Sequence, residues 1–560
     1  MQADDSTNGV PEGRSRRNWT REEATALVAE YEALSAEGIG QREFAELRGV
    51  PLGTLQYWLA RKAGLDADPV LVGLLESPTG LAFLHRLVVA AMFQFCHVGP
   101  CGVDHVGEFL RLAGLGEFVA TSHAVMHELG GDMEQAIVDF GTFQRAALAA
   151  GMRPRPIVVA QDETFHPEVC LVAIEPASNF ILLERYAPNR EAATWTAAMT
   201  EALSDLPVEV VAAASDEGRW LIAHITRGLG VPQAPDVMHA QRELWKALGK
   251  PLAHSLKAPF KALEEAEATV ATWCRHRADF YSNPRGPGRA PVFEKYIAAA
   301  RTQVQACRSL YAVAVARCDR AEAAIRALGR AYHPVDLITG ALRDAAQVEA
   351  DLTAAMTTLD AVAEALELPA ERRAHIDKAR RVVTKQVAHI AFFHAHIGRQ
   401  LAEFTTDEAL REIIRTGFIP ALYVLKVAAQ APTAAERNTL RATGQRLLKH
   451  TRCALANVSD ELRRDAERLA AECVDVFVRG TSCVEGRNGQ LALRHHSLHR
   501  LSDRRLAALT VIHDYHIRRP DGTTAAQRFF GADHDELFEW LLDHLDVPAR
   551  PRSHSQRRAA

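Results

Sequence analysis

Three acidic residues, far apart in the chain, stand where carboxylates could hold divalent metal ions. Asp162 ends the apolar run RPIVVAQDE, Asp216 follows VEVVAAAS, and Glu485 lies near the start of a helix expected to resume after Gly480. Two divalent ions about 3.5–4 Å apart can activate an attacking oxygen and stabilise a leaving oxygen in phosphodiester cleavage. Mg²⁺ prefers oxygen ligands and keeps several waters, so a few carboxylates from separate elements suffice. The three acids therefore predict a site for two Mg²⁺ or Mn²⁺ ions.

Asp162 and Asp216 each have an acidic neighbour, Glu163 and Glu217 respectively. Successive side chains of a strand point to opposite faces, so only one acid of each pair can face a common site. We expect the aspartate in both pairs, although acids at strand ends are also common as solvated residues. Glu485 has a simple alternative too, because the helix dipole stabilises any acid in the first turn of a helix.

Other residues near the second aspartate could support the site. Asp236 and His239 have a D-x-x-H spacing and could steady the metal ions or position a phosphate. They could equally be a helix N-cap and a packed histidine. Trp220 could stack on a flipped base or belong to the core.

The elements that must position these residues begin with three apolar runs over residues 155–187, which predict three consecutive strands. A helix over 189–206, a fourth strand over 208–217, a helix over 218–230 and a short fifth strand over 234–239 follow. This order is that of the ribonuclease H-like fold. That fold places one Asp on the first strand, one just after the fourth strand and one acid on a late helix.

Near the N-terminus, residues 19–64 show three short helices separated by turns at Gly38 and Gly49, a pattern typical of a helix-turn-helix. Such a module places its last helix in the DNA major groove. The same pattern also fits a small helical bundle used for oligomerisation. The residues expected to contact DNA from this helix are Thr54, Gln56, Tyr57, Arg61 and Lys62.

A second DNA-contacting surface is expected after Glu485, where the chain is helical and basic. Positive charge there would neutralise phosphates beside the metal ions. A solvated basic face would have the same composition. The residues expected to contact DNA are Arg487, Asn488, Arg494 and His495.

The 560 residues exceed what one hydrophobic core normally holds. The expected fold class is multidomain α plus α/β, with a ribonuclease H-like mixed-sheet core interrupted by a large all-α insertion and preceded by a helix-turn-helix. The expected parts are a disordered basic arm at 1–18, the helix-turn-helix at 19–64, a helical intermediate domain at 65–152, the first part of the core at 153–245, the insertion at 246–477, the final part of the core with basic helices at 478–547, and a disordered tail at 548–560.

Three elements, SDEGRW (215–220), PDVMH (235–239) and CVEGRNGQLALRHH (483–496), resemble those of bacterial DDE transposases whose catalytic core is split by a helical insertion. The arrangement is similar to that of hAT transposases, in which a [C/D]-x-x-H motif follows the second Asp and a helical domain precedes the final Glu. The resemblance covers residues 155–245 and 478–530 in detail, and the insertion only in position and character.

That resemblance implies Mg²⁺ or Mn²⁺, double-strand cleavage at element ends and strand transfer into target DNA. It implies Asp162, Asp216 and Glu485 as catalytic and metal-binding residues, with Asp236 and His239 as accessory residues. Double-stranded DNA would be the partner, and a homodimer or higher oligomer is expected because two ends must be joined. The N-terminal module is a helix-turn-helix rather than a zinc finger, so the resemblance extends to the mechanism and not to the subfamily.

The composition, with 48% hydrophobic and 24% charged residues, is ordinary for a soluble globular protein. The N-terminus lacks an apolar signal core, and no apolar run reaches the roughly 18 residues of a membrane span. We therefore expect a cytoplasmic, nucleoid-associated protein without membrane contact. Because the formal net charge is −5, the positive charge needed for DNA binding must be concentrated in part of the surface. Two alternatives stay open: a catalytically inactive, transposase-derived DNA-binding regulator, and a ribonuclease H-like structure-specific nuclease.

Overall fold

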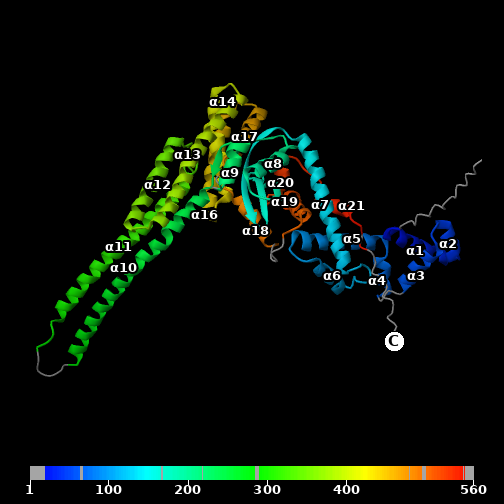
Figure 1. Ribbon diagram of the computed structural model, residues 1–560, viewed down its shortest axis with the longest axis horizontal. Coiled ribbons are helices and arrows are strands. Elements are labelled where there is room, and N and C mark those ends of the chain that lie inside the picture. Colours follow the sequence, from blue (N-terminus) through cyan, green and yellow to red (C-terminus); the bar gives the residue numbers. More distant parts are fainter. Residues whose placement is uncertain are drawn as a thin grey trace, which may run out of the picture. The chain divides into compact units, whose positions relative to one another are not determined.

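The computed structural model describes all residues except 1–18, 64–66, 166–167, 217, 284–288, 479, 495–499, 547 and 549–560. The chain forms two compact units, one combining residues 1–150 with 501–560 and the other spanning 151–500. Most described residues are helical, and five strands form one small mixed sheet (Figure 1). The expected multidomain α plus α/β class is therefore confirmed.

The sheet belongs to the 151–500 unit. Its strands are β1 (Arg155–Phe165), β2 (Val169–Glu175), β3 (Phe180–Tyr186), β4 (Val208–Ser215) and β5 (Gln233–Pro235). They lie in the order β3-β2-β1-β4-β5, with β1 parallel to β4 and antiparallel to β2. β3 is antiparallel to β2, and β5 is parallel to β4. The strands expected from the apolar runs are confirmed, and the fifth is only three residues long.

One face of the sheet packs against α8 (Ala192–Leu203), α9 (Arg219–Ala223) and the π-helical turn η2 (His224–Leu229). Trp195 is buried there and stacks on His224, with ring centroids 5.7 Å apart. Gln161 on β1 contacts the same histidine, at 3.2 Å between Nε2 atoms. The odd-numbered residues near the end of β1 therefore face these helices, and the even-numbered residues face the other way.

The rest of this unit is helical and has its own large apolar core. Ala, Leu and Val at helical spacing supply that core, as the amphipathic pattern predicted. Its helices are α10 (Val237–Ser282), α11 (Phe293–Ala331), α12 (Ala345–Ala365), α13 (Ala370–Phe404), α14 (Glu408–Ile413), η3 (Ile414–Phe418), α15 (Ile419–Gln430), α16 (Ala434–Ala454), α17 (Asp460–Asp475) and α18 (Ser482–Ala492).

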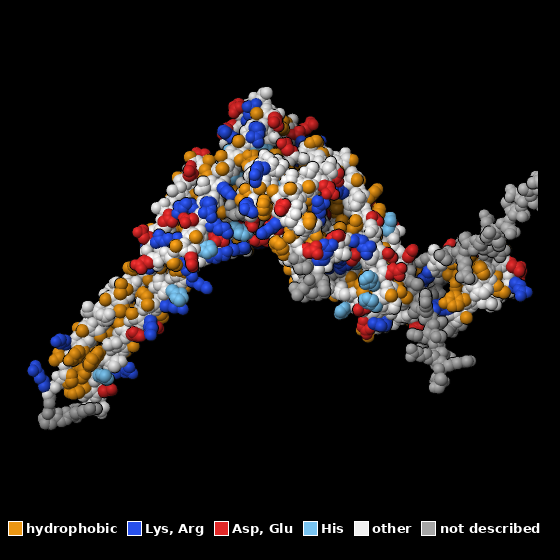
Figure 2. Space-filling view, viewed as in Figure 1, with side chains coloured by type: hydrophobic (Ala, Val, Ile, Leu, Met, Phe, Trp, Pro, Cys, Tyr) orange, Lys and Arg blue, Asp and Glu red, His pale blue; other side chains and the backbone are white. Residues whose placement is uncertain are grey.

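The far halves of α10 and α11 extend from this unit as a two-helix arm (Figure 1). Trp273 and Tyr296 stack across it, with ring centroids 4.7 Å apart. Figure 2 shows hydrophobic side chains on its surface, and Tyr281 and Leu310 are exposed by 67% and 64%. Such apolar surface suits association, but the expected homodimer or higher oligomer stays a prediction.

The other unit contains the three helices expected for a helix-turn-helix. Phe44 and Leu55 are fully buried between them, and Gly38 and Gly49 end the first two helices with positive φ angles of 101° and 65°. The helices of this unit are α1 (Arg21–Ala36), α2 (Gln41–Arg48), α3 (Leu52–Ala63), α4 (Pro69–Leu75), α5 (Pro78–Met92), η1 (Phe93–Val98), α6 (Val103–Leu112), α7 (His123–Gly151), α19 (Asp503–Tyr515), α20 (Ala525–Phe530) and α21 (Leu537–His544).

The last three helices correct the expected boundary of the core at 478–547. Tyr515 packs against Phe140 of α7 at 5.6 Å between ring centroids, and Asp535 accepts a hydrogen bond of 2.6 Å from Gln144. These helices therefore complete the N-terminal unit, and only α18 stays with the sheet. The sequence did not reveal this, because an amphipathic helix specifies a buried face but not the element that covers it.

One stretch, Pro78–Val98, is long and apolar enough to cross a membrane by length and composition, with 21 residues and a mean hydropathy of 1.5, which corrects the expectation that no apolar run reaches that length. Leu84, Val88 and Met92 within it are fully buried, and half of its most apolar window lies inside the protein. A core helix of a soluble protein has these properties, so the absence of membrane contact stays a prediction. The arm expected at 1–18 lies outside the described residues, as does the tail apart from Pro548.

Candidate functional site

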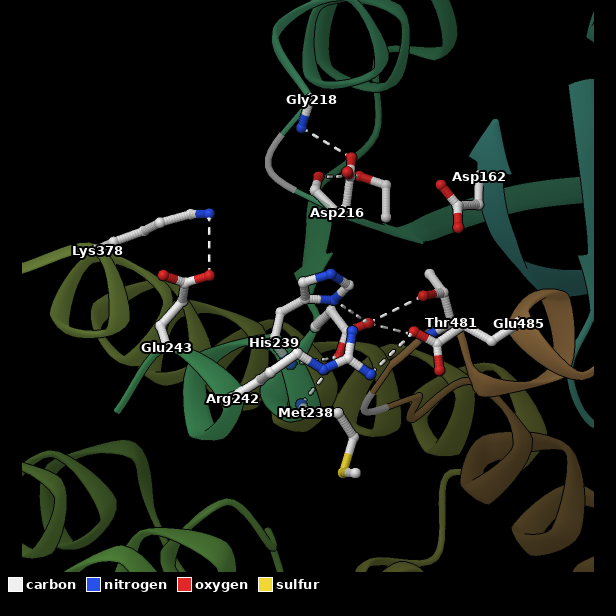
Figure 3. A network of polar contacts seen from close by, with 12 residues as sticks. Asp162, Asp216, Gly218, Met238, His239, Arg242, Glu243, Lys378, Thr481 and Glu485 are labelled. Carbon is white, nitrogen blue, oxygen red and sulfur yellow. Dashed lines mark hydrogen bonds and ion pairs between the residues drawn. The ribbon is translucent and has the colours of Figure 1, made fainter. Parts of the chain in front are cut away.

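Asp162 and Asp216 lie where the pairing between two neighbouring parallel strands ends, Asp162 within β1 and Asp216 directly after β4. Gln161 of β1 pairs with Ser215 of β4, so the next residue on each strand is one of the two aspartates. Figure 3 shows the Asp162 side chain beside the Asp216 loop. The structure therefore brings together two acids that are 54 positions apart in the sequence.

The neighbouring acid Glu163 points to the opposite face of the sheet. It accepts a hydrogen bond of 3.3 Å from Trp195 Nε1 and lies 3.8 Å from an Arg190 guanidinium nitrogen. Asp162 instead shares its face with its cross-strand partner Val172 and with Glu184, which pairs with Val172. Of the first pair, Asp162 is the residue available to the site. Glu217, the neighbour of Asp216, lies outside the described residues.

The loop after β4 fixes the position of Asp216. Its Oδ1 accepts a hydrogen bond of 2.8 Å from the backbone N–H of Gly218, and its carbonyl oxygen accepts one of 3.0 Å from Gln233 on β5. A Cβ atom at position 218 would lie 2.8 Å from that same Oδ1. Glycine is therefore the residue that leaves this carboxylate in place.

Burial and the nearby Asp216 carboxylate raise the pKa of Asp162 from 3.8 to about 7, although the hydrogen bond from the Glu163 backbone N–H and the charge of His239 oppose them. A buried carboxyl group beside a second carboxylate has no nearby charge that fully compensates it. A divalent cation between the two would remove this repulsion, and its preferred ligands are carboxylate oxygens. The donor atoms present therefore suit Mg²⁺ or Mn²⁺.

Asp236 and His239 connect the end of β5 to α18. Asp236 caps α10 by accepting from the backbone N–H groups of Met238 and His239, and its Oδ2 lies 3.0 Å from His239 Nδ1. The same Oδ2 accepts a hydrogen bond of 2.9 Å from the hydroxyl of Thr481. Burial alone would raise the pKa of Asp236, but these hydrogen bonds outweigh it and lower the pKa. The hydrogen bond to Asp236 raises the pKa of His239.

Glu485 lies on α18, one turn after Thr481, and Figure 3 shows its carboxylate beside Arg242 and Thr481, on the side of the site where Asp162 lies. It is exposed and lies 3.6 Å from the guanidinium of Arg242 on α10. Within the part of the chain that the structure describes, no three His, Cys, Asp or Glu side chains are already close enough to form a metal-binding cluster.

A pocket of about 310 Å³ adjoins Asp216 and His239 and includes residues that the sequence analysis missed. Its far wall consists of Glu243 and Lys246 of α10 and Lys378 of α13. The lysines belong to the region expected as a helical insertion, where no motif marked them.

Residues 414–557 match a family of unknown function, DUF6399. The matched segment includes α18 and Glu485, but not β1 or β4. Comparisons of the chain with curated proteins and with solved structures give no match.

The residues expected to contact DNA near α18 have different environments. Arg487 is buried, and its guanidinium forms a two-contact ion pair with the fully buried Glu184, the closer separation being 2.5 Å. It therefore holds α18 against the sheet instead of facing a phosphate, which corrects its expected role. Asn488 and Arg494 are half-buried, and His495 lies outside the described residues.

Trp220 is 37% exposed and lies under the guanidinium of Arg219, at 4.3 Å.

On α3, Gln56 and Tyr57 are exposed, whereas Thr54 and Arg61 are half-buried. Lys62 forms an ion pair of 2.7 Å with Glu32. The exposed pair is therefore the part of the expected DNA-reading helix that is presented to solvent.

Proposed function

We propose that this protein is a DDE-type transposase, a metal-dependent enzyme that cleaves and joins DNA, with a ribonuclease H-like core. The observation that carries the proposal is that Asp162 in β1 and Asp216 after β4 directly follow the last paired residues of these two strands, in a sheet of order β3-β2-β1-β4-β5. α18 supports it further, because this helix packs on the face of the sheet that carries Asp162 and carries Glu485 on that same side (Figure 3).

In this proposal Asp162 and Asp216 would hold two divalent ions, with Glu485 as the third ligand. Mg²⁺ or Mn²⁺ bound there would supply an activated oxygen nucleophile and would stabilise the leaving oxygen. In this structure the Arg242 guanidinium forms an ion pair with the Glu485 carboxylate, at 3.6 Å. Its positive charge holds the carboxylate on that side of the site, and the exposed pair is weak enough to exchange for a metal ligand.

Asp236 and His239 act as positioning residues rather than as metal ligands in this proposal. The Asp236 carboxylate already receives hydrogen bonds from the backbone of α10, from His239 and from Thr481. These contacts join the ends of β5, α10 and α18, so they set the distance between Glu485 and the two aspartates. The exposed Gln56 and Tyr57 of α3 are proposed to read the element ends.

The experiment that tests the function incubates the full chain with DNA from both flanks of its own gene, with Mg²⁺, with Mn²⁺, and with neither. We expect metal-dependent cleavage at defined flanking positions, and loss of at least about 10³-fold in rate for Asp216→Asn. Glu163→Gln is the matched control, because this neighbouring acid faces α8, and it should retain activity. Binding of the DNA without cleavage by the wild-type protein would favour an inactive regulator, and cleavage that follows branched structure instead of sequence would favour a structure-specific nuclease.

A further inference from the structure

Beside the proposed metal site, α10 and α13 hold two lysines around one buried carboxylate. Glu243 Oε1 lies 2.8 Å from Lys246 Nζ and 3.4 Å from Lys378 Nζ, and its Oε2 lies 2.5 Å from His375 Nδ1. The Glu243 side chain is only 4% exposed, whereas those of Lys246 and Lys378 are 51% and 42% exposed. The carboxylate is therefore the anchor of the group, and the ammonium groups reach solvent.

This group has more positive than negative charge. Although burial opposes ionisation of Glu243, its hydrogen bonds with Lys246 and His375 lower its pKa to about 2, so it carries one negative charge at neutral pH. The two lysines together exceed that charge by one, even with His375 neutral. Each ammonium has three N–H donors and uses one on Glu243, so further donors point away from the carboxylate.

Both lysines line the pocket of about 310 Å³ that Asp216, Asp236 and His239 also line. That volume suits one nucleotide-sized group and is too small for a duplex. α13 is also connected to the aspartate loop, since Lys385 donates a hydrogen bond of 3.2 Å to Gln233, which in turn donates to the carbonyl oxygen of Asp216.

We propose that Lys246 and Lys378 form a subsite for one backbone phosphate of a DNA strand, next to the phosphate that the proposed metal site would cleave. This inference rests on the proposed function and extends it, because it gives the helical region a direct part in holding the substrate. Glu243 orients the two ammonium groups before DNA arrives, which lowers the cost of ordering them on binding.

The test measures binding of a fluorescently labelled, mixed-sequence single-stranded oligonucleotide over a range of NaCl concentrations, with chelator present so that no cleavage is needed. We expect Lys378→Met and Lys246→Met each to reduce the slope of log affinity against log salt by about 0.7, the contribution of one phosphate contact in a single strand. Lys378→Arg, which keeps the charge, should retain the slope. Lys261→Met is the control, because Lys261 lies on the same helix α10 but is 77% exposed and pairs with Glu265.

Glu243→Gln separates a binding role from a structural role. The glutamine keeps an oxygen that accepts from the two ammonium groups and so preserves their orientation, but it removes the negative charge that opposes them, so the affinity for the oligonucleotide should rise and the slope should steepen. A wild-type slope in both lysine variants, or weaker binding by Glu243→Gln with its thermal unfolding still cooperative, overturns the phosphate subsite alone. Absence of any salt-dependent DNA binding by the wild-type protein overturns the proposed function as well.

Discussion

The Asp162 carboxyl group lies where its ionised form reduces the stability of the fold. It is partly buried, it lies beside Asp216, and its pKa is raised from 3.8 to about 7 by burial and by that neighbour. In the unfolded chain the same group ionises near its ordinary value. The folded state therefore becomes less stable as pH rises from 3.8 towards 7, because ionisation is harder in the folded protein than in the unfolded chain.

Asp162→Asn is expected to abolish cleavage and yet to stabilise the metal-free protein. At pH 8 the substitution removes the unfavourable buried charge, so the free energy of unfolding should rise by on the order of 1–3 kcal/mol. At pH 4 the gain should largely disappear, since the carboxyl group is then mostly protonated. Thermal unfolding at both pH values, with and without Mg²⁺, measures this.

Glu209→Gln, at an exposed position near the start of β4, is the control and should leave both stabilities unchanged. Mg²⁺ should stabilise the wild-type protein and not Asp162→Asn. A variant that is less stable than the wild type at pH 8 without metal would show that Asp162 has a structural role instead.

For single residues, the sequence predicted the direction of a side chain correctly where a local rule determines it. The alternation of a strand separates Asp162 from Glu163, and the structure directs only Asp162 towards α18. It was a poor guide for Arg487, which was expected to contact DNA. The buried partner Glu184 lies 303 positions away, and no local pattern predicts such an ion pair.

Among the elements, α18 has the most demanding position, since it must bring Glu485 to a sheet formed by residues some 300 positions earlier. Two buried contacts hold it there: Arg487 with Glu184 on β3, and Thr481 with Asp236 at the end of β5. The first attaches the helix to the sheet. The second fixes its first turn, in which Glu485 lies.

Thr481→Val should reduce cleavage more than it reduces folding. The lost hydrogen bond to a charged group costs about 1.5–3 kcal/mol of stability. The displacement of Glu485 that follows should lower kcat by up to about 10²-fold, because a misplacement of about 1 Å has effects of that size. Steady-state cleavage kinetics and thermal unfolding measure the two effects separately.

Thr481→Ser keeps the hydroxyl group and should restore most of kcat. Ser482→Ala, at the exposed next position, should have little effect on either measurement. Equal loss of kcat in Thr481→Ser and Thr481→Val would contradict the positioning role.

The sequence did not predict that lysines of α10 and α13 would line the pocket beside Asp216. His375, Lys378, Val382 and Lys385 are spaced by three and four residues, so they share one face of α13. The sequence of α13 contains many other charged residues, so these positions gave no distinct signal. Their significance depended on β5 and the Asp216 loop lying beside them, and this proximity arises only in the folded protein.

At the scale of the whole molecule, the chain leaves its N-terminal unit after residue 150 and returns to it at residue 501. Phe140 contacts both Tyr515 and Trp540, each at 5.6 Å between ring centroids. The N-terminal unit is therefore incomplete without the last helices. The apolar pattern predicted the helices themselves, but not that they return to this unit.

A fragment of residues 151–500 should fold cooperatively, because its sheet and helical core are both complete. Residues 1–150 alone should be unstable, and addition of residues 501–560 as a separate peptide should restore their folding. Circular dichroism during thermal unfolding measures each case. Cooperative unfolding of 1–150 alone, at the same temperature with and without the peptide, would contradict this division.

The proposed catalysis requires three acids, from β1, from the loop after β4 and from α18, to share a pair of metal ions. The most direct measurement is an anomalous difference map from crystals of the full chain soaked in Mn²⁺. We predict two peaks about 3.5–4 Å apart. Carboxylate oxygens of Asp162 should contact both peaks, and each peak should also be contacted by Asp216 or by Glu485. Glu485 should then no longer pair with Arg242. Mn²⁺ that binds elsewhere, or leaves Glu485 on Arg242 and outside the coordination of either ion, would contradict the central claim.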